Sequence, residues 1–221
     1  MGLRNWPVVG LAVAVAVSAA AIISGTAPTA RADGCPDVEL VFARGTAEPP
    51  GLGRVGDALF AALQPALGSR SLQAYPVNYP ASYNLLTTGA GADDARNHIA
   101  WMADQCPATR IVLGGFSQGA AAVSMLAGVP PLGDRIGNFG SAAPLDPGLA
   151  GKVAAVAVFG NPGIRFGTPL SSAGLFAGRA IDLCSPGDPV CTVGGRDRSA
   201  HSDYESPPYP GQAAGFVAGL V

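Results

Sequence analysis

The sequence predicts an α/β domain built on a five-stranded parallel β-sheet with helices on both faces. Short apolar segments rich in β-branched residues alternate along the chain with longer segments of helical periodicity, the order that parallel sheets require. Most of the short segments are nearly continuous apolar runs, which is typical of strands covered on both sides. The chain has 221 residues and shows neither an internal repeat nor an interdomain linker, so one domain is expected.

Each element is justified by its own local pattern. The predicted strands are residues 38–43, 71–77, 110–115, 153–159 and 179–184. The predicted helices are residues 53–67, 91–106, 117–129 and 211–221, the second of which carries acidic residues in its first turn. The Pro- and Gly-rich segment 129–148 is expected to form surface loops.

The first 32 residues are predicted to be a secretory signal peptide and not part of the fold. A charged start with Arg4 precedes a long apolar segment, and the tripeptide Ala-Arg-Ala ending at Ala32 is a small-x-small cleavage site. The alternative is a retained membrane anchor, because the apolar segment is about the minimum length that spans a bilayer. We expect cleavage near Ala32, which leaves the domain 33–221 secreted or in the cell envelope, without a transmembrane segment.

The charge balance of the mature domain narrows the classes of partner. Once Arg4 and Arg31 are removed with the signal peptide, 11 basic and 15 acidic residues remain, and the basic residues form no stripe. This composition argues against nucleic acid as a partner. Hydrophobic residues make up 48% of the chain and charged residues 13%, so the chain has enough apolar side chains for a buried core. We expect the protein to be a monomer.

The mature domain contains four cysteines: Cys35, Cys106, Cys184 and Cys191. An even number after a signal peptide indicates disulfides, and four cysteines allow three pairings. Cys184 and Cys191 are close enough to pair across one loop, which leaves Cys35 to pair with Cys106. A zinc site is the alternative, but the chain has no C-x-x-C pair and only two histidines, so we expect no metal.

The segment Gly-Phe-Ser-Gln-Gly, residues 115–119, is the strongest chemical signal. It stands where a predicted buried strand ends and a helix begins, at the edge of the sheet where α/β proteins bind ligands. A G-x-S-x-G pattern can be an ordinary turn. In this position it also matches a sharp turn that exposes a nucleophilic serine, with glycines leaving room for the backbone. Ser117 is therefore the candidate nucleophile.

A serine hydroxyl requires a neighbouring base, usually a histidine oriented by a carboxylate. The chain offers His98 and His201. His201 follows the last predicted strand and fits the chain order serine, acid, histidine that α/β-hydrolases use. His98 precedes Ser117 and occupies a polar position of an amphipathic helix, so we expect a surface histidine or one satisfied by its neighbours.

Asp188 is the candidate acid, in the segment Cys-Ser-Pro-Gly-Asp-Pro-Val-Cys directly after the last predicted strand. A turn aspartate is the alternative, but a loop closed by Cys184 and Cys191 would hold a carboxylate firmly against a histidine. Other aspartates suit the role less well. Two lie too early in the chain, one lies inside a strand where it is expected to face solvent, and two lie beside His201 and are expected to solvate its loop: Asp134, Asp146, Asp182, Asp197 and Asp203.

Acyl transfer also requires donors for the oxyanion of the tetrahedral intermediate. The backbone N–H of Gln118 is one candidate, because it follows the serine at a helix N-terminus where amides point outward. Thr46, in the loop after the first strand, is the second candidate through its N–H and its hydroxyl.

These motifs resemble the cutinase family of serine esterases, especially the secreted cutinase-like proteins of mycobacteria and other actinobacteria. The matching segments are Phe-Ala-Arg-Gly-Thr after the first strand, the serine turn, the cysteine-bracketed aspartate and the later histidine, and the resemblance covers residues 33–221. It implies a compact α/β-hydrolase without a lid and without a metal or organic cofactor. It also implies that Ser117 is the nucleophile, His201 the base and Asp188 the acid. In the same way it implies that Thr46 and Gln118 form the oxyanion hole.

The resemblance implies a secreted serine esterase that acts on a small ester or lipid substrate through an acyl-enzyme. Where plant-polymer cutinases flank their histidine with apolar residues, this chain has the polar segment 192–205, so we expect short to medium acyl chains and little activity on bulk polyesters. The segment 79–91, with Tyr83, Leu85 and Leu86, is the expected apolar wall. The alternatives are a phospholipase, acyltransferase or peptidase using the same triad, or a catalytically weak secreted surface or antigen protein.

Overall fold

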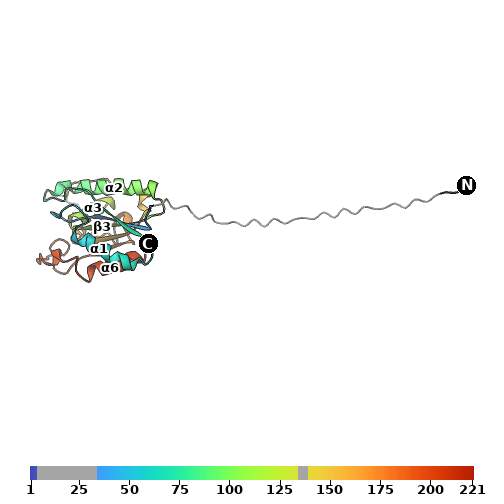
Figure 1. Cartoon of the computed structure of the whole chain (residues 1–221). Helices are drawn as coiled ribbons and strands as arrows, with labels where there is room; N and C mark the ends of the chain where they lie inside the picture. The colour runs from blue at the N-terminus through green and yellow to red at the C-terminus, as the bar shows by residue number, and fades with distance from the viewer. Residues whose placement is uncertain (4–33, 134–138) are drawn as a thin grey trace. The chain divides into compact units, whose positions relative to one another are not determined.

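The computed structural model describes residues 1–3, 34–133 and 139–221 of the chain (Figure 1). The predicted signal peptide and its cleavage site at Ala32 lie outside the described residues, except for the first three positions. The segment from Arg31 to Val221 forms one unit by itself, and it contains every described helix and strand.

Within the described residues, five strands form one parallel sheet, as predicted. The strands are β1 Val38–Ala43, β2 Leu72–Pro76, β3 Arg110–Phe116, β4 Val153–Phe159 and β5 Ala180–Leu183. Their order is β2-β1-β3-β4-β5, and each neighbouring pair is parallel. Every residue of β1 and β4 is buried, which explains why these segments are almost continuously apolar.

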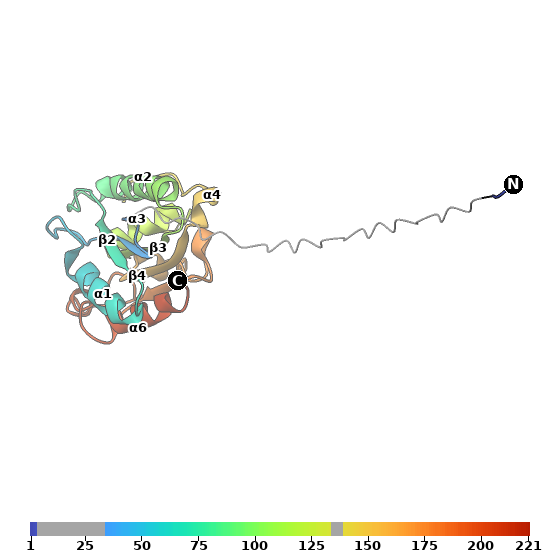
Figure 2. The same cartoon turned by 45° about the vertical axis from the view of Figure 1, so that its right-hand side comes forward.

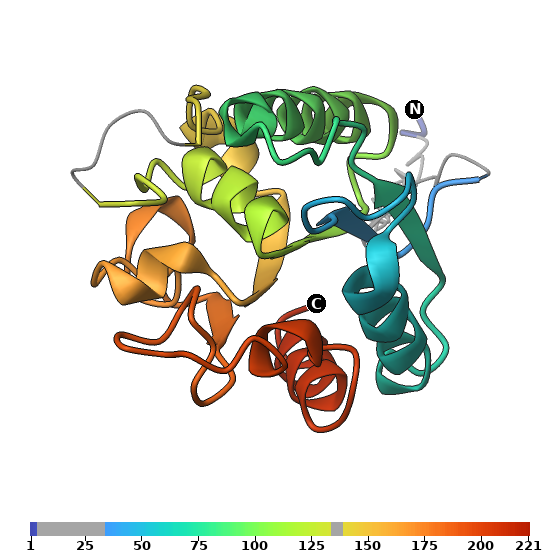
Figure 3. The same cartoon turned by 90° about the vertical axis from the view of Figure 1, so that its left-hand side faces the viewer.

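Long helices cover both faces of the sheet (Figures 1 and 3). α2 (Thr88–Gln105) and α3 (Gln118–Leu126) lie on one face, and α1 (Gly53–Ala66) and α6 (Tyr209–Ala218) lie on the other. The connections contain α4 (Pro147–Ala150), visible in Figure 2, α5 (Pro162–Arg165), and the 3-10 turns η1 (Leu85–Thr87), η2 (Gly174–Phe176) and η3 (Ala200–Ser202). In the described part of the chain, no helix is both long and apolar enough to cross a bilayer.

Successive side chains of a strand enter different hydrophobic cores. In β1, Leu40 and Phe42 pack with α1 and α6, whereas Val41 and Ala43 pack with α2 and α3. All four are at most 2% exposed. A shift of one residue would move each side chain to the wrong core, so the register of β1 is strongly specified. The loop that follows β1, which contains Thr46, therefore begins at a fixed place on the carboxyl edge of the sheet.

Two helices begin earlier than the sequence predicts. α2 begins at Thr88 because the turn η1 leads directly into it, and the Thr88 hydroxyl donates to the carbonyl oxygen of Leu85, 2.6 Å away. α6 begins at Tyr209, with Pro210 in a first turn where the missing N–H costs nothing. Periodicity reports the packed interior of a helix more faithfully than its first turn.

Cys35 is bonded to Cys106 and Cys184 to Cys191, the pairing expected from their spacing. The paired Cα atoms are 5.6 and 5.9 Å apart, within the usual range. The first bond joins the segment before β1 to the end of α2 across 71 residues, and closing a loop of that length contributes about 4 kcal/mol in the chain-entropy account. Two disulfides are typical of a protein that works outside the reducing cytoplasm.

Candidate active site

Ser117 occupies a sharp turn between the last residue of β3 and the first residue of α3. Its backbone angles are φ 54° and ψ −109°, a conformation that residues with a side chain seldom adopt. The two glycines of the motif are required sterically: a Cβ on Gly119 would lie 1.9 Å from the carbonyl oxygen of Ala43, and one on Gly115 would lie 2.5 Å from the backbone of Gly119. The local sequence thus permits a turn that presents the serine side chain at the carboxyl edge of the sheet.

The structure brings Ser117, His201 and Asp188 together. His201 Nε2 lies 2.9 Å from Ser117 Oγ, and His201 Nδ1 lies 2.9 Å from Asp188 Oδ2. Ser117 lies in the turn after β3, Asp188 in the loop after β5 and His201 in the turn η3. The side chain of His201 is 20% exposed and that of Asp188 is fully buried, so solvent reaches the histidine but not the carboxylate. This is the arrangement of a nucleophile, a base and an orienting acid.

Asp188 remains ionised in its buried position because donors surround its carboxylate. Its Oδ1 accepts a hydrogen bond from the backbone N–H of Val190, 2.7 Å away, and its Oδ2 accepts one from the Tyr204 hydroxyl at 2.6 Å. Burial acts to raise the pKa of Asp188, but the hydrogen bonds with His201, Tyr204 and Val190 outweigh it and hold the pKa below its ordinary value. A carboxylate in this state can stabilise a protonated histidine.

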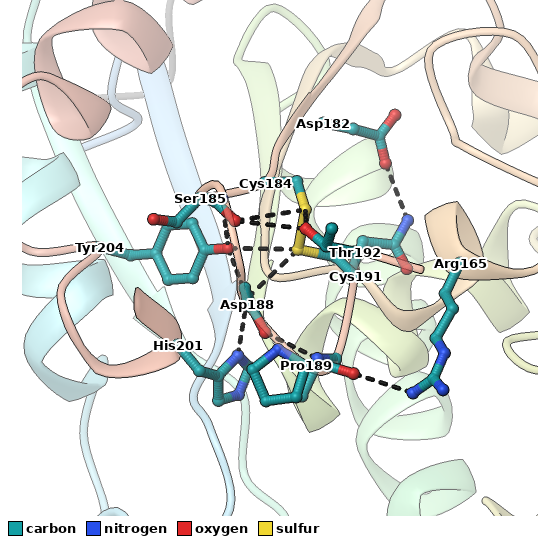
Figure 4. The surroundings of a disulfide bond; sticks show 12 residues. Arg165, Asp182, Cys184, Ser185, Asp188, Pro189, Cys191, Thr192, His201 and Tyr204 are labelled. Carbon is teal, nitrogen blue, oxygen red and sulfur yellow. Dashed lines mark hydrogen bonds and ion pairs between the residues drawn. A yellow bond between two sulfur atoms is a disulfide. The ribbon is translucent and has the colours of Figure 1, made fainter. Parts of the chain in front are cut away.

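The short disulfide loop holds Asp188 in place (Figure 4). Cys184 and Cys191 close it, and the Asp188 N–H donates to the carbonyl oxygen of Ser185 at 3.1 Å. From outside, the Arg165 guanidinium at the end of α5 donates to the carbonyl oxygen of Pro189, 2.9 Å away. The loop is therefore restrained covalently and by hydrogen bonds on both sides of the carboxylate.

Tyr204 is a contact residue that sequence reasoning missed. It is fully buried, and its ring lies against the rings of Phe116, Phe159 and His201. The one sequence signal that could have indicated it is its position three residues after His201. Burial, followed by the hydrogen bond to Asp188, raises the pKa of the Tyr204 hydroxyl far above its ordinary value, so it stays protonated.

Thr46 and Gln118, the two candidate oxyanion donors, lie side by side. The Thr46 hydroxyl donates to Gln118 Oε1 at 3.0 Å, Gln118 Nε2 donates to the Thr88 hydroxyl oxygen at 2.9 Å, and Thr88 donates to Leu85. In this series of hydrogen bonds the Thr46 hydroxyl gives its hydrogen to Gln118. The sequence predicts both the N–H and the hydroxyl of Thr46 as oxyanion donors, but in this arrangement the hydroxyl hydrogen is already used and the N–H is the candidate donor.

Buried Arg44, which precedes the Gly-Thr pair, braces this loop. It donates to the carbonyl oxygens of Glu48, Val77 and Tyr79 at 2.9, 3.3 and 2.7 Å. The Glu48 carboxylate in turn accepts from the N–H of Gly45 at 2.6 Å. Arg44 of the Phe-Ala-Arg-Gly-Thr segment thus supports the loop that carries Thr46, a role that its sequence position alone did not reveal.

His98 lies away from Ser117, with its partners near the amino end of β1. Its Nε2 lies 3.0 Å from Glu39 Oε2, and its ring stacks on that of Tyr75 with centroids 3.5 Å apart. The side chains of His98 and Glu39 are 11% and 7% exposed. Of the two expectations for His98, a surface position is wrong and a histidine satisfied by its neighbours is right.

The remaining aspartates have structural partners. Asp182 does not simply face solvent, because its carboxylate accepts from Asn161 Nδ2 at 2.8 Å and from the Ser171 N–H at 2.7 Å. Asp197 caps the turn before η3 through Ser199, and hydrogen bonds there lower its pKa. The others are accounted for as follows: Asp203 accepts from the Ser206 hydroxyl, Asp146 caps α4, and Asp134 lies outside the described residues.

The two expected walls of the site differ in chemistry. Tyr83 and Leu86 are 85% and 58% exposed, and their segment leads into Thr88, which contacts Gln118. Val193, 77% exposed, adds an apolar residue to the segment between Asp188 and His201. Four charged residues in this segment and just after His201 are exposed: Arg196, Asp197, Arg198 and Asp203. Among the described residues, no group of three histidine, cysteine or acidic side chains could hold a metal ion.

Comparison with known proteins gives a consistent picture. The sequence model described as cutinase matches residues 34–221. Probable carboxylesterase Culp3 of Mycobacterium tuberculosis is 52% identical over 192 residues, which are 86% of this chain and 71% of the relative. Phospholipase Culp4 and carboxylesterase Culp1 of the same species are 45% and 39% identical, covering 95% and 96% of this chain and 90% and 93% of their own lengths.

Solved structures resemble the fold. A Trichoderma reesei cutinase, in complex with a C11Y4 phosphonate inhibitor, has a TM-score of 0.66 at 34% identity, covering 86% of this chain and 78% of that one. The catalytic core domain of acetyl xylan esterase from Trichoderma reesei has a TM-score of 0.72 at 24% identity, covering 85% of this chain and 100% of that one. The second comparison supports the fold alone.

Proposed function

The chain belongs to the cutinase family, and on that premise we propose that it is a carboxylic ester hydrolase working through Ser117, His201 and Asp188. One observation carries this proposal above the others. A single imidazole lies within 2.9 Å of both the serine hydroxyl and a buried carboxylate. A structural histidine would have no need of a strained serine on one nitrogen and an ionised aspartate on the other.

In the first half-reaction, Ser117 Oγ attacks the ester carbonyl carbon while His201 Nε2 takes the hydroxyl proton. The carbonyl electrons move to its oxygen, and the N–H groups of Gln118 and Thr46 donate to the resulting oxyanion. Asp188 keeps its negative charge and stabilises the imidazolium through Nδ1–H. The intermediate collapses, the alcohol leaves with the proton from Nε2, and an acyl-Ser117 remains.

In the second half-reaction, water replaces the alcohol. His201 Nε2 removes a proton from the water as its oxygen bonds to the acyl carbon. The same N–H groups stabilise the second oxyanion, and collapse returns the proton to Ser117 Oγ as the carboxylic acid is released. The partial exposure of His201 gives water access to the acyl-enzyme.

The walls of the site favour a substrate of limited length. Tyr83, Leu86 and Val193 offer apolar contacts, and each methylene that they remove from water contributes up to about 0.8 kcal/mol. The charged residues around His201 are costly to desolvate against an extended lipid surface. These opposing walls suit soluble or dispersed esters with acyl chains of roughly four to ten carbons, and they suit waxy polyesters poorly.

A phospholipase is the second candidate, since a relative 45% identical over most of this chain is named a phospholipase. Exposed Arg196 and Arg198, in the segment before His201, offer positive charge to a lipid phosphate. The triad chemistry would be the same, because the acyl-enzyme is common to esterases, phospholipases, acyltransferases and peptidases.

The decisive experiment measures the purified protein on esters of increasing acyl length, on dispersed phospholipid and on a peptide substrate. Ser117→Ala is the control. Rates that rise over a few carbons and then level off support the esterase. Rates that keep climbing to long-chain triglycerides, with activation at an oil–water interface, contradict the proposed substrate range. A protein that an organophosphate fails to label at Ser117 is instead a surface protein on a hydrolase scaffold.

We also propose that the protein acts as a monomer outside the cytoplasm, after cleavage near Ala32. The two disulfides and the small-x-small tripeptide support this. Mass spectrometry of the protein from culture medium and from isolated envelope gives its first residue and its location. Light scattering on the purified protein gives its mass in solution.

A further inference from the structure

The hydroxyl of Tyr204 lies at the centre of the candidate site but has no part in the steps above. It is 2.6 Å from Asp188 Oδ2, and the N–H of Ser185 donates to it from 2.8 Å. Figure 4 shows Tyr204 and His201 next to the same aspartate. Tyr204 is fully buried, and its hydroxyl is held by two hydrogen bonds, so its position relative to Asp188 is fixed by the fold.

The direction of this hydrogen bond follows from chemistry. An ionised carboxylate can only accept, and the Ser185 N–H can only donate. The tyrosine oxygen therefore accepts from Ser185 and gives its one hydrogen to Asp188. Because burial and the hydrogen bond to Asp188 raise the pKa of Tyr204, the hydroxyl stays protonated and can act as a donor.

Asp188 Oδ2 consequently receives two donors, the Tyr204 hydroxyl and His201 Nδ1–H. Two donors on one oxygen share its negative charge, so each donor weakens the hydrogen bond that the oxygen makes with the other donor. We propose that Tyr204 is a positioning residue that moderates the Asp188–His201 hydrogen bond and so sets how readily His201 gives up its proton. This inference rests on the proposed function of the triad.

The surroundings of Tyr204 allow its hydroxyl little freedom. Its ring packs against Phe116, Phe159 and Tyr209, with centroids 5.0 to 6.1 Å away. Because Tyr204 follows His201 by three residues, the same turn of chain carries both donors to the carboxylate. A shift of this turn would therefore displace the imidazole and the hydroxyl together.

The charged and titratable groups around this pair come from several elements. Asp188 belongs to the loop after β5, His201 to η3 and Tyr209 to α6. The guanidinium of Arg54, on α1, lies over the ring of Phe116, which itself neighbours both His201 and Tyr204. Removing only the Tyr204 hydroxyl leaves all of these other side chains in the protein, so the effect of that one donor can be measured by itself.

The first test compares Tyr204→Phe with Tyr209→Phe. The ring of Tyr209 packs against that of Tyr204, with centroids 5.0 Å apart. Tyr209 has no role in the proposed mechanism, so it is the matched control. Without its second donor, Asp188 Oδ2 binds the imidazolium more strongly. The acid limb of kcat/KM against pH should then move upward by roughly one pH unit, so that kcat/KM on that limb falls by up to about tenfold while the plateau at higher pH changes less. Tyr209→Phe should leave the profile in place.

The second test strengthens the donor. Tyr204→3-fluorotyrosine keeps the shape and the hydroxyl but makes it a better donor, so the acid limb should move downward. A readout free of activity is the proton NMR signal of His201 Nδ1–H, identified by its loss in His201→Ala; the chain has only two histidines. This signal should move downfield in Tyr204→Phe and upfield with fluorotyrosine.

The outcomes separate the two proposals. If the wild-type protein hydrolyses no ester and takes no organophosphate label, the proposed function fails, while the NMR signal still tests the hydrogen bond. If the wild type is active but Tyr204→Phe keeps its acid limb and its Nδ1–H signal, losing only thermal stability, then Tyr204 is a packing residue and the inference is wrong. Shifts of opposite sign in the two Tyr204 variants support it.

Discussion

Arg54 of helix α1 donates a hydrogen bond to the carbonyl oxygen of Ser202, 2.7 Å away, across 148 residues of sequence. The same guanidinium pairs with the Glu205 carboxylate, and its Nε lies 3.3 Å from Glu48 Oε1. Glu48 also accepts from the N–H of Gly45, in the loop that carries Thr46. One side chain therefore connects the loop that carries His201 to the loop that carries Thr46.

Replacing this connection should slow catalysis more than it weakens the fold. In Arg54→Met we expect kcat to fall on the order of tenfold because the imidazole is held less accurately. The free energy of unfolding should fall by less than about 1 kcal/mol, since the arginine side chain is 40% exposed. Steady-state kinetics and urea unfolding measure both quantities.

Arg110→Met is the matched control for Arg54. Arg110 is also exposed and also donates to a backbone carbonyl oxygen, that of Leu220 at 3.2 Å, but it is the first residue of β3, at the strand end opposite Ser117. We expect it to keep the wild-type kcat. Equal losses of kcat in the two variants would show that Arg54 has no specific connection to the site.

The strained turn at Ser117 predicts a conflict between activity and stability. Ser117→Ala and Ser117→Gly should both lose ester hydrolysis by several orders of magnitude, because the nucleophile is gone. Glycine tolerates φ 54° and ψ −109°, so Ser117→Gly should be more stable than Ser117→Ala by about 1 kcal/mol, or roughly 2–4 °C in Tm. A Ser117→Ala variant that keeps substantial activity would reduce the motif to an ordinary turn.

The depressed pKa of Asp188 predicts how stability depends on pH. Because the folded pKa lies below the unfolded value of about 3.9, the carboxylate contributes stability above that value and loses it as pH falls through the folded pKa. Asp188→Asn should therefore be less stable than the wild type at pH 7, and the difference should shrink on acidification below about pH 4. Urea unfolding of both proteins at neutral and acidic pH measures this.

The same Asp188→Asn variant should lose about four orders of magnitude in kcat, since an amide cannot hold the required histidine tautomer or stabilise an imidazolium. A difference in stability that stays constant with pH would mean that Asp188 is not the titrating group. Full activity would remove it from the proposed triad.

The two histidines should respond in opposite ways. His201→Ala should abolish hydrolysis with a smaller change in stability, because the buried Asp188 carboxylate keeps the hydrogen bonds from Tyr204 and Val190. His98→Ala should leave activity nearly unchanged but destabilise the fold by about 1–3 kcal/mol, since it leaves the buried Glu39 carboxylate without its partner. Thermal unfolding and ester hydrolysis of both variants decide, and the reverse pattern would overturn the assignment of the base.

Local sequence carried the prediction of the five strands and of the serine turn. The strands β1 and β4 are buried on both faces, and their sequences are accordingly nearly continuous apolar runs. Glycine is required at 115 and 119 because a Cβ at either position would lie within 2.5 Å of neighbouring backbone. Such features depend on a residue and its near neighbours. The chain order of serine, aspartate and histidine pointed to the three side chains that the structure brings within hydrogen-bonding distance.

Contacts between distant residues could not be read in this way. The starts of α2 and α6, the partners of His98 and Asp182, and the supporting roles of Arg44, Arg54 and Tyr204 all depend on which loops meet at the sheet edge. A tyrosine in a polar segment gives no sign that it is fully buried.

The sequence by itself thus determined the strands, the turn and the candidate reactive groups, because periodicity, steric fit and side-chain chemistry are local properties. Only the tertiary structure decided how those groups are held. It set the strand order, buried Asp188 beneath two donors and joined the His201 loop to α1. The physical reason is that orientation and burial come from packing between segments that lie far apart in the chain.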